Sequence, residues 1–581
     1  MSPSNEEITG LKSLEMEIGG HIPETNELQP HFIGYTIKDD IITGLSLFSC
    51  GLENIPNGII HFHNLEKLIL KGNIIKLFSK RICTLDSLKL LDLSENGLKF
   101  IPEDIINLEL LENLNIESND LENLPNNIGN LNNLKSLNLG ANKIKKIPES
   151  LGNLKKLEFL NLSNNQISEL PNSIGSLNSL KFFYITHNNL SSVPETIGSL
   201  SSLERLNIRS NNLTYLPESF GSLENLTSCF LKGNKLKSLP KTIGSLKSLK
   251  YLGLNSNQLE TLPNSIGSLS NLENLSMNEN SITHLPIEIE KLELLIRFDI
   301  QDNKLNSLPE NIGNLRNLKI FLLTNNKISS LPESIGLLKS LESLNLKQNN
   351  LEEIPTTING LSSLKELDLY GNNLKYLPDS LGDILNLEIL DLSSNNIEAL
   401  PESICKLKFL KELDLSTNKL EDIPPCIGEL RSLRNLILGF NNLNEISECI
   451  GNLKDLEVLD LGKNHLKEIP KSIGNLKSLQ FLYLYYNNLE SIPEEICYLE
   501  NLEYLNLSNN QLKTIPESIG TIKSIEYLFL NTNQLEKIPD SIGNLPNIKH
   551  IDLKKNKYEK VPAFLRVLEE RGIKIITDLD L

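Results

Sequence analysis

The chain has 581 residues, 39% of them apolar and 5% aromatic, with no Trp and only 3 Met. This apolar content excludes a wholly disordered chain, and the scarcity of rings argues against a core filled with aromatic side chains. The net charge of −18 makes nucleic acid and anionic membranes poor partners, because both would be repelled.

The first residues contain no basic region followed by an apolar run, so no signal peptide is expected. No stretch reaches the roughly 18–20 consecutive apolar residues of a membrane span. A cytoplasmic location follows as an expectation.

Residues 1–41 are expected to form an N-terminal cap. Asn5–Gly20 has the pattern of a helix that ends at Gly19 and Gly20. Phe32–Leu47 has the pattern of a hairpin that turns at Asp39 and Asp40. A cap of this kind would cover an otherwise open sheet edge.

A 23-residue period then runs through residues 42–570 without insertion or deletion. Stepping by 23 from Asn73 meets an Asn each time up to Asn556, and one step back reaches Cys50. From 50 to 556 is 506 residues, or 22 steps of 23, so there are 23 repeats. Each unit follows the pattern LxxLxLxxNxLxxLPxxIGxLxx, whose first Leu we number position 1.

The spacing predicts one short strand per repeat, with the central Leu pointing inward. One strand cannot bury its apolar stripe alone, so successive units are expected to stack as a parallel sheet. The Asn at position 9 is suited to satisfy backbone groups where the chain leaves the strand. Pro, replaced only by Ser79 and Ser447, starts a segment predicted to be a helical turn or short helix.

After the last full repeat, Pro562–Arg571 predicts an amphipathic helix that stops at Gly572. Ile573–Thr577 predicts a last strand. Together with the helix at about 562–571, residues 571–581 are expected to close the C-terminal end.

The repeat pattern resembles the leucine-rich repeat superfamily. This resemblance implies an α/β solenoid of horseshoe or superhelical form, with a parallel concave sheet and short helical turns on the convex side. The LPxxIGxL segment is similar to that of an intracellular class, which includes plant Ras-group repeat proteins and animal Ras-binding scaffolds. Prokaryotic and archaeal cytosolic repeat proteins share it as well.

No Walker A sequence, GxSxG elbow, HExxH helix or kinase motif occurs, so an enzyme is not expected and no cofactor is implied. His61 and His63 lie close together but lack a third ligand, which disfavours a metal site. Cys426 and Cys449 occupy equivalent places in adjacent repeats, within reach of a disulfide. The odd count of 7 Cys and the missing secretion signal favour buried free thiols instead.

The exposed strand positions 3, 5 and 7 are where a repeat protein generally binds partners. Position 2 alternates Glu and Lys from Glu66 to Glu204 and again from Lys319 to Lys411, which we interpret as a structural ladder of ion pairs. An acidic column lies at position 5 in Asp368, Asp391 and Asp414, flanked by Glu366, Glu412 and Asp460. Steering of a basic partner is one interpretation of this column. The common use of Asp or Asn at position 5 favours a structural one.

Two sets of residues are the candidate partner-binding sites. The first, the C-terminal aromatic cluster, consists of Phe481, Tyr483, Tyr485, Tyr486, Tyr504, Tyr527 and Phe529. The second, the Arg–aromatic cluster, consists of Phe159, Phe182, Tyr184, Arg205, Arg209, Phe230 and Tyr251. Exposed rings and Arg on a rigid sheet are typical of interaction hot spots. The alternative is that the rings only stack across strands as a structural ladder.

The sequence therefore predicts a non-enzymatic scaffold that binds a partner protein through its concave face. The family resemblance implies small GTPases, or signalling enzymes that they control, as partners in intracellular signalling. The alternative is an exported effector or surface adhesin that binds host proteins.

Overall fold

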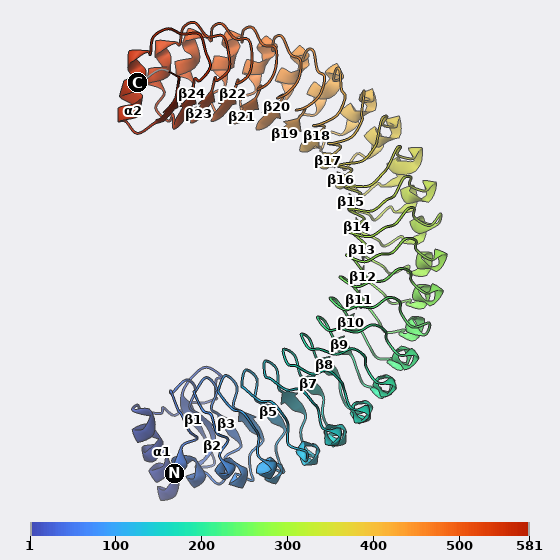
Figure 1. Cartoon of the computed structure of the whole chain (residues 1–581), viewed down its shortest axis with the longest axis vertical. Helices are drawn as coiled ribbons and strands as arrows, with labels where there is room; N and C mark the ends of the chain where they lie inside the picture. The colour runs from blue at the N-terminus through green and yellow to red at the C-terminus, as the bar shows by residue number, and fades with distance from the viewer. Residues whose placement is uncertain (1–2, 579–581) are drawn as a thin grey trace. The chain divides into compact units, whose positions relative to one another are not determined.

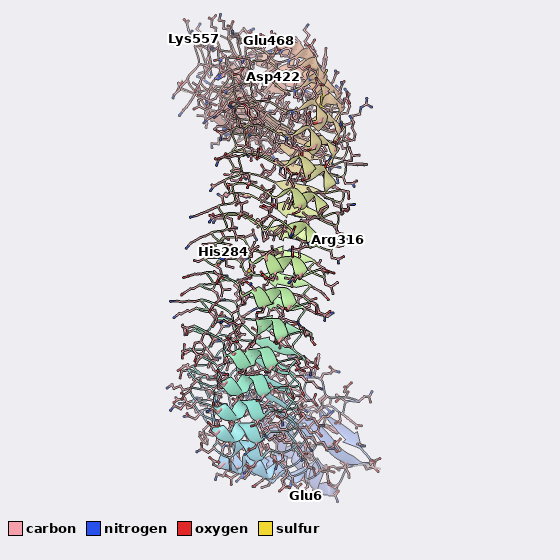
Figure 2. The ribbon with its side chains drawn as sticks, turned by 90° about the vertical axis from the view of Figure 1, so that its right-hand side faces the viewer. Glu6, His284, Arg316, Asp422, Glu468 and Lys557 are labelled. Carbon is pink, nitrogen blue, oxygen red and sulfur yellow. A yellow bond between two sulfur atoms is a disulfide. The ribbon has the colours of Figure 1, made fainter. Side chains whose placement is uncertain are left out.

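The computed structural model describes residues 3–578, which fall into two compact units, one up to Ile282 and one from Thr283. Each unit is a solenoid of stacked repeats. Figure 1 shows that within each unit the strands line the concave side and the helical turns line the convex side. Figure 2 views the stacked turns from outside, with Arg316 beside them in the second unit.

The first unit begins with helix α1 (Asn5–Ile18), followed by β1 (Gly34–Lys38) and β2 (Ile41–Ser46). Ten further strands follow, one per repeat: β3 (Lys67–Ile69), β4 (Leu90–Asp92), β5 (Asn113–Asn115), β6 (Ser136–Asn138), β7 (Phe159–Asn161), β8 (Phe182–Tyr184), β9 (Arg205–Asn207), β10 (Ser228–Phe230), β11 (Tyr251–Gly253) and β12 (Asn274–Ser276). The 3-10 turns between them are η1 (Asn57–His61), η2 (Lys80–Thr84), η3 (Glu103–Asn107), η4 (Ile128–Asn130), η5 (Glu149–Asn153), η6 (Asn172–Ser176), η7 (Glu195–Ser199), η8 (Glu218–Ser222), η9 (Ile243–Ser245) and η10 (Asn264–Ser268).

The second unit repeats this architecture and ends with helix α2 (Ala563–Glu570) and strand β25 (Lys574–Ile576). Its other strands are β13 (Arg297–Asp299), β14 (Ile320–Leu322), β15 (Ser343–Asn345), β16 (Glu366–Asp368), β17 (Ile389–Asp391), β18 (Glu412–Asp414), β19 (Asn435–Ile437), β20 (Val458–Asp460), β21 (Phe481–Tyr483), β22 (Tyr504–Asn506), β23 (Tyr527–Phe529) and β24 (His550–Asp552). The 3-10 turns are η11 (Ile287–Lys291), η12 (Ile312–Asn314), η13 (Glu333–Leu337), η14 (Thr356–Gly360), η15 (Asp379–Asp383), η16 (Glu402–Lys406), η17 (Pro425–Glu429), η18 (Glu448–Asn452), η19 (Lys471–Asn475), η20 (Glu494–Tyr498), η21 (Glu517–Thr521) and η22 (Asp540–Asn544).

The predicted parallel sheet is confirmed within each unit, because paired residues differ by one repeat. Leu137 pairs with Leu160 across β6 and β7, and Leu482 pairs with Leu505 across β21 and β22. Each repeat strand consists of positions 3, 4 and 5, and the central side chain is buried. Positions 3 and 5 therefore face outward on the concave side, as the spacing predicts.

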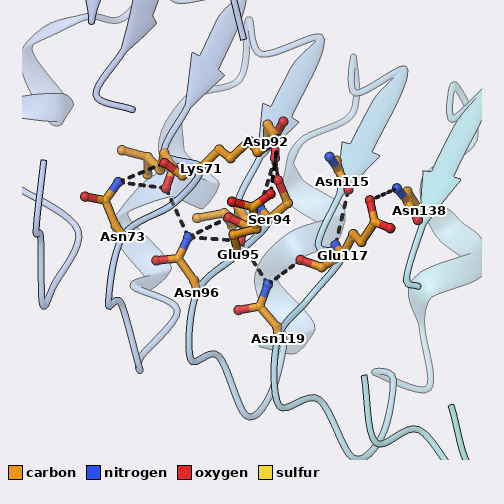
Figure 3. A network of polar contacts seen from close by, with 12 residues as sticks. Lys71, Asn73, Asp92, Ser94, Glu95, Asn96, Asn115, Glu117, Asn119 and Asn138 are labelled. Carbon is orange, nitrogen blue, oxygen red and sulfur yellow. Dashed lines mark hydrogen bonds and ion pairs between the residues drawn. The ribbon is translucent and has the colours of Figure 1, made fainter. Parts of the chain in front are cut away.

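The Asn at position 9 joins consecutive repeats. The Asn119 Oδ1 accepts a hydrogen bond from the Leu98 backbone N–H at 2.9 Å, and its Nδ2 donates to the Leu93 carbonyl at 2.9 Å. Asn96 makes the same bonds to Ile75 and Leu70 one repeat earlier. Figure 3 shows the side-chain nitrogens of Asn73, Asn96 and Asn119 donating to oxygen atoms beside them. These amides satisfy backbone groups that would otherwise be buried without partners.

The convex turns are started by Pro and kept close by Gly. Pro171 lies in the extended conformation just before η6, and where Ser447 replaces Pro its side chain accepts a hydrogen bond from the Cys449 N–H at 3.3 Å. A Cβ on Gly175 would lie 2.1 Å from the Thr196 carbonyl oxygen of the next repeat. A side chain at Gly175 would therefore collide with the next turn.

A disulfide links Cys405 and Cys426, whose Cα atoms are 5.7 Å apart, so the expectation of free thiols is wrong for this pair. The residue at the Gly position of the LPxxIGxL segment packs against the residue that comes 21 places later in the chain. It does not pack against the Gly position of the next repeat, which comes 23 places later. At Gly428, for example, a Cβ would lie 3.2 Å from the Cys449 Cβ. Cys405 occupies a Gly place, so its partner is Cys426, whereas Cys449 faces a glycine and stays free.

The first sheet edge is covered by α1 and the hairpin. The Glu7 carboxylate is buried, completes a capping box with Ser4, and accepts a hydrogen bond from the Ile42 N–H at 3.0 Å. Gly19 ends the helix with φ 65°, and Asp39 and Asp40 turn the hairpin with φ 52° and 64°. The predicted segments were Asn5–Gly20 and Phe32–Leu47; the structure has a helix over Asn5–Ile18 and strands over Gly34–Lys38 and Ile41–Ser46.

The C-terminal edge is covered by β25, which pairs with β24, and by α2, whose Leu565 and Leu568 are buried. Phenylalanine also enters the core, since Phe183, Phe298 and Phe321 replace Leu at position 4 and are fully buried. Phe298 and Phe321 stack with ring centroids 5.2 Å apart. A few aromatic rings therefore enter a core that consists mainly of Leu and Ile. Among the described helices, none has the length and apolar character that crossing a membrane requires.

Candidate functional site

Position 2 forms the predicted ladder of ion pairs along one margin of the strand face, the surface made by positions 3, 5 and 7. Lys89 pairs with Glu66 at 2.9 Å, and Lys181 pairs with Glu158 at 2.8 Å. In the second unit, Glu342 lies between Lys319 and Lys365, at 3.1 Å from each. Because these charges neutralise one another and are exposed, the pairs contribute little to stability and leave little charge for a partner.

The acidic residues at position 5 hold the chain where it leaves the strand. Asp391 accepts a hydrogen bond from the Ser393 backbone N–H at 2.9 Å, and Asp414 accepts one from Ser416 at 2.8 Å. Asn161 does the same for Ser163 at 3.0 Å. The structural interpretation of this column is therefore supported by its bonds.

Burial nevertheless perturbs several of these carboxyl groups. Desolvation raises the pKa of Asp368 and of Asp414 despite their backbone hydrogen bonds. The largest effect is at Asp460, where burial raises the pKa to about 6 against a hydrogen bond from Gly462. Asp460 lies at the border of the C-terminal aromatic cluster.

The C-terminal aromatic cluster is one continuous group of rings on β21–β23. Tyr504 is its centre, with ring centroids 5.0 Å from Tyr483, 5.2 Å from Phe529, 5.9 Å from Tyr527 and 6.3 Å from Phe481. Such separations are those of favourable aromatic pairs. The sequence places these residues in columns, and the structure brings them into contact.

Tyr485 and Tyr486 extend the cluster past the strand end. The Tyr485 ring crosses Gly462, where a Cβ would lie 2.2 Å from the ring, and it meets Tyr483 edge-on at 6.5 Å. Burial and the nearby Asp460 carboxylate raise the pKa of Tyr485 to about 12. Gly462 thus makes room for a ring that a larger residue would displace.

Three further residues join this surface without having been singled out in the sequence. His550 is buried beside Phe529, with ring centroids 5.0 Å apart. The Lys463 ammonium lies 4.3 Å from the Phe440 ring centroid and 5.4 Å from that of Tyr486. Phe440 and Lys463 share position 8 of the repeat with Tyr486, two repeats and one repeat before it. A search limited to positions 3, 5 and 7 omits that position.

The Arg–aromatic cluster is also assembled, but through guanidinium–ring contacts. Arg205 lies 5.1 Å and Arg209 lies 4.4 Å from the Phe230 ring centroid, and Arg205 lies 6.0 Å from that of Tyr184. The Phe159 and Tyr184 rings are 5.6 Å apart. Within residues 3–578, Phe182 and Tyr251 make no ring contact. Phe182 pairs with Arg205 at position 3, whereas Ser228 lies between Arg205 and Tyr251.

The histidine pair meets one carboxylate. Glu6 Oε1 lies 3.5 Å from His61 Nδ1 and 3.4 Å from His63 Nε2. These hydrogen bonds lower the pKa of Glu6. No group of three or more metal-ligating side chains is arranged to hold an ion in the part of the chain that the structure describes.

Sequence and structure comparisons agree on the family. The family model described as leucine-rich repeat region matches overlapping segments between residues 126 and 570, and a single leucine-rich repeat matches residues 87–108. The chain belongs to the leucine-rich repeat family. No curated protein matches it significantly.

Among solved structures, the plant peptide hormone receptor RGFR1, in complex with RGF2, is 32% identical, with a TM-score of 0.75 over 93% of this chain and 91% of that one. The Arabidopsis receptor kinase HAESA, in complex with the peptide hormone IDA and the co-receptor SERK1, is 28% identical, with a TM-score of 0.63 over 99% and 96%. YopM from Yersinia enterocolitica, 24% identical with a TM-score of 0.56 over 83% and 90%, shares the fold. Plant receptors and bacterial repeat proteins are therefore its structural neighbours.

Proposed function

We propose that this protein is a non-enzymatic scaffold that binds a partner protein through its strand face. The observation that carries the proposal is the C-terminal aromatic cluster, a continuous patch of rings on three adjacent strands. Its rim is accessible, with Tyr486 53% and Tyr527 37% exposed. Aromatic anchors on a rigid surface supply most of the binding energy in many interfaces. The similar receptors whose structures contain bound peptide hormones support a binding role.

The test removes three rings together by Tyr483→Ala, Tyr504→Ala and Tyr527→Ala. A matched control removes three exposed tyrosines outside the cluster, Tyr215, Tyr376 and Tyr498. Cross-linking mass spectrometry on the captured complex reports the partner and the contact face together. We expect the cluster variant to weaken binding at least roughly 30-fold, since loss of one central anchor costs about 2 kcal/mol or more.

The control variant should bind as the unchanged protein does, and circular dichroism should show that both variants are folded. Equal binding by the folded cluster variant, with cross-links away from β21–β23, would mean that the rings serve only as a structural ladder. In that case the partner face lies elsewhere.

For the partner class, we propose small GTPases or the signalling enzymes that they control, acting in the cytoplasm. The support is the similarity of the LPxxIGxL segment to the intracellular Ras-group class. Identification of the cross-linked partner tests this directly. Recovery of an extracellular ligand from intact cells would contradict it.

The second candidate is an exported effector or adhesin that binds host proteins. It is favoured by one observation, the Cys405–Cys426 disulfide, because disulfides persist mainly in oxidising compartments. Cell fractionation with rapid alkylation of free thiols separates the two. A soluble cytoplasmic pool with Cys405 and Cys426 alkylated supports the scaffold in signalling, whereas an extracellular pool with both protected supports export.

A further inference from the structure

Arg205 and Arg209 share one aromatic platform. Both guanidinium groups lie over the Phe230 ring, at 5.1 Å and 4.4 Å from its centroid, and both side chains are exposed. Arg205 also approaches Tyr184. Stacking of this kind holds a guanidinium in place while leaving its N–H edges free to donate.

No carboxylate within residues 3–578 forms an ion pair with either arginine. The contrast with position 2 is clear, because there each Lys of the ladder faces a Glu. The pKa of Arg209 is lowered, because its side chain is partly buried and because Arg205 nearby carries the same charge. Two cations are thus held close together without a counter-charge, in a chain whose net charge is −18.

The surroundings extend this cationic spot and give it an apolar rim. Lys232 occupies position 7 one repeat after Arg209 and is exposed. Gly253 lies at position 5 beside Phe230, and a Cβ there would be 3.5 Å from the ring. Because Gly has no side chain, nothing projects from the sheet next to Phe230 at this position. Tyr251, 41% exposed, stands at position 3 of the same strand. The site therefore combines guanidinium donors with neighbouring rings.

We propose that Arg205 and Arg209 bind the side-chain carboxylate of an acidic segment in a partner protein, with an apolar residue next to that carboxylate resting on Tyr184 or Tyr251. This inference rests on the proposed function in that the ligand is a protein, but it uses a different surface from the C-terminal aromatic cluster. It assigns the first unit its own ligand chemistry.

A carboxylate matches the geometry of these donors. Each guanidinium is planar, and Phe230 covers its face, so the exposed donors form a fork that matches the planar carboxylate. Nucleic acid phosphates are disfavoured by the charge of the whole chain. An acidic segment with apolar neighbours uses both the donors and the rings.

The experiment uses the full chain and arrays of 12-residue peptides that are acetylated and amidated, so that no terminal charge competes. The central residue is Glu in one array, Gln in a second and phosphoserine in a third, with the same uncharged flanking residues, Leu and Phe among them. The variants are Arg205→Gln with Arg209→Gln, and a matched control, Arg431→Gln, which changes an exposed arginine of the second unit.

We expect the Glu array to exceed the Gln array by about tenfold or more, as hydrogen bonds to charged groups imply. The double variant should bring this ratio to about one, and Arg431→Gln should leave it unchanged. A ratio near one for the unchanged protein, a preference for phosphoserine, or a ratio kept by the folded double variant would each overturn the proposal.

A second measurement does not depend on a variant. Phenylglyoxal modifies accessible arginines, and mass spectrometry locates the adducts. The best Glu peptide should protect Arg205 and Arg209 but not Arg431. Equal modification with and without the peptide would contradict the site.

The two proposals fail separately. The Tyr483→Ala, Tyr504→Ala and Tyr527→Ala variant should keep the full Glu-to-Gln ratio, because those residues belong to the second unit. Loss of partner capture in that variant with the ratio intact leaves the arginine site standing. Loss of the ratio in the unchanged protein removes the arginine site alone.

Discussion

Asn188 and Asn189 are adjacent residues with different structural roles. Asn188 is buried; its Oδ1 accepts from the Ile167 N–H at 2.9 Å and its Nδ2 donates to the Leu162 carbonyl at 2.9 Å. The Asn189 side chain is exposed. We expect Asn188→Ala to lower the free energy of unfolding by about 2–4 kcal/mol, because it leaves buried backbone groups without partners.

Denaturant unfolding of both variants provides the measurement. Asn189→Ala is the matched control and should change the free energy of unfolding by less than about 0.5 kcal/mol. Equal effects of the two substitutions would show that the ladder of amides does not stabilise the stack.

Asp460 gives a pH dependence at the scale of one residue. Its pKa in the folded protein is about 6, above the ordinary 3.8, because burial disfavours the charged form. Between about pH 4 and pH 6 the folded state keeps a proton that the unfolded state has lost, so the free energy of unfolding falls as pH rises. Above about pH 6 Asp460 is ionised in both the folded and the unfolded state, so the free energy of unfolding falls no further on account of this group.

We therefore expect Asp460→Asn to stabilise the protein by about 1–3 kcal/mol at pH 7. The new amide can still accept from the Gly462 N–H, as Asn161 does from Ser163. Unfolding curves at pH 4 and pH 7 measure the effect, which should largely vanish at pH 4. A variant less stable than the unchanged protein at pH 7 would contradict the assigned cost of the buried charge.

Among the elements, α1 is positioned by a contact between two glycines. A Cβ on Gly10 would lie 2.9 Å from the His61 Cβ, and one on Gly58 would lie 3.0 Å from the Gly10 carbonyl oxygen. Helix propensity alone favours Gly10→Ala by about 1 kcal/mol. The steric clash of the new Cβ costs about 1–3 kcal/mol, which outweighs the gain in helix propensity. We therefore expect Gly10→Ala to destabilise the N-terminal cap.

Hydrogen exchange of α1 and β2 measures this outcome. Gly20→Ala is the matched control, because a Cβ there meets nothing within 4 Å. Faster exchange in Gly10→Ala and unchanged exchange in Gly20→Ala are expected. Slower exchange in Gly10→Ala would mean that propensity outweighs the contact.

The turn elements carry the disulfide. Cys405 and Cys426 are 21 residues apart, and closing a loop of this size stabilises a protein by about 3 kcal/mol. We expect Cys426→Ser to lose about that amount in the oxidised protein, whereas Cys449→Ser should change little. Peptide mapping without reductant reports the pairing directly, and a Cys426–Cys449 link would contradict the structure.

The elements also show what a sequence pattern can and cannot predict. The period of 23 residues predicts each strand, since Leu160 and its equivalents must all face one core. The pairing of Cys405 with Cys426 could not be read from that period, because packing across the turns is offset by two residues from it. The stacking of Arg205 and Arg209 on Phe230 depends on side-chain conformations that spacing does not determine. The contact between the Tyr485 ring and Gly462 likewise depends on a side-chain conformation that spacing does not determine.

At the scale of the molecule, each unit carries one cluster with its own chemistry. Phe230 in the first unit is overlaid by two guanidinium groups that form no ion pair with a carboxylate of residues 3–578. Tyr504 in the second unit is surrounded by rings, with the partly buried Asp460 at their border. Both clusters lie on the strands or directly after them, at exposed positions that vary from repeat to repeat, while the buried positions stay nearly constant.

The same organisation predicts how the molecule unfolds. Leu160 in β7 and Leu505 in β22 are both fully buried, and each pairs with the equivalent residues one repeat away. Replacement by Ala leaves a cavity that costs about 3–5 kcal/mol. In a stack held by contacts between neighbouring repeats, we expect that cost to appear locally.

Hydrogen exchange by mass spectrometry should show faster exchange around β6–β8 in Leu160→Ala and around β21–β23 in Leu505→Ala, each leaving the other region unchanged. Faster exchange in both regions for either variant would instead mean that the chain opens as a single cooperative structure.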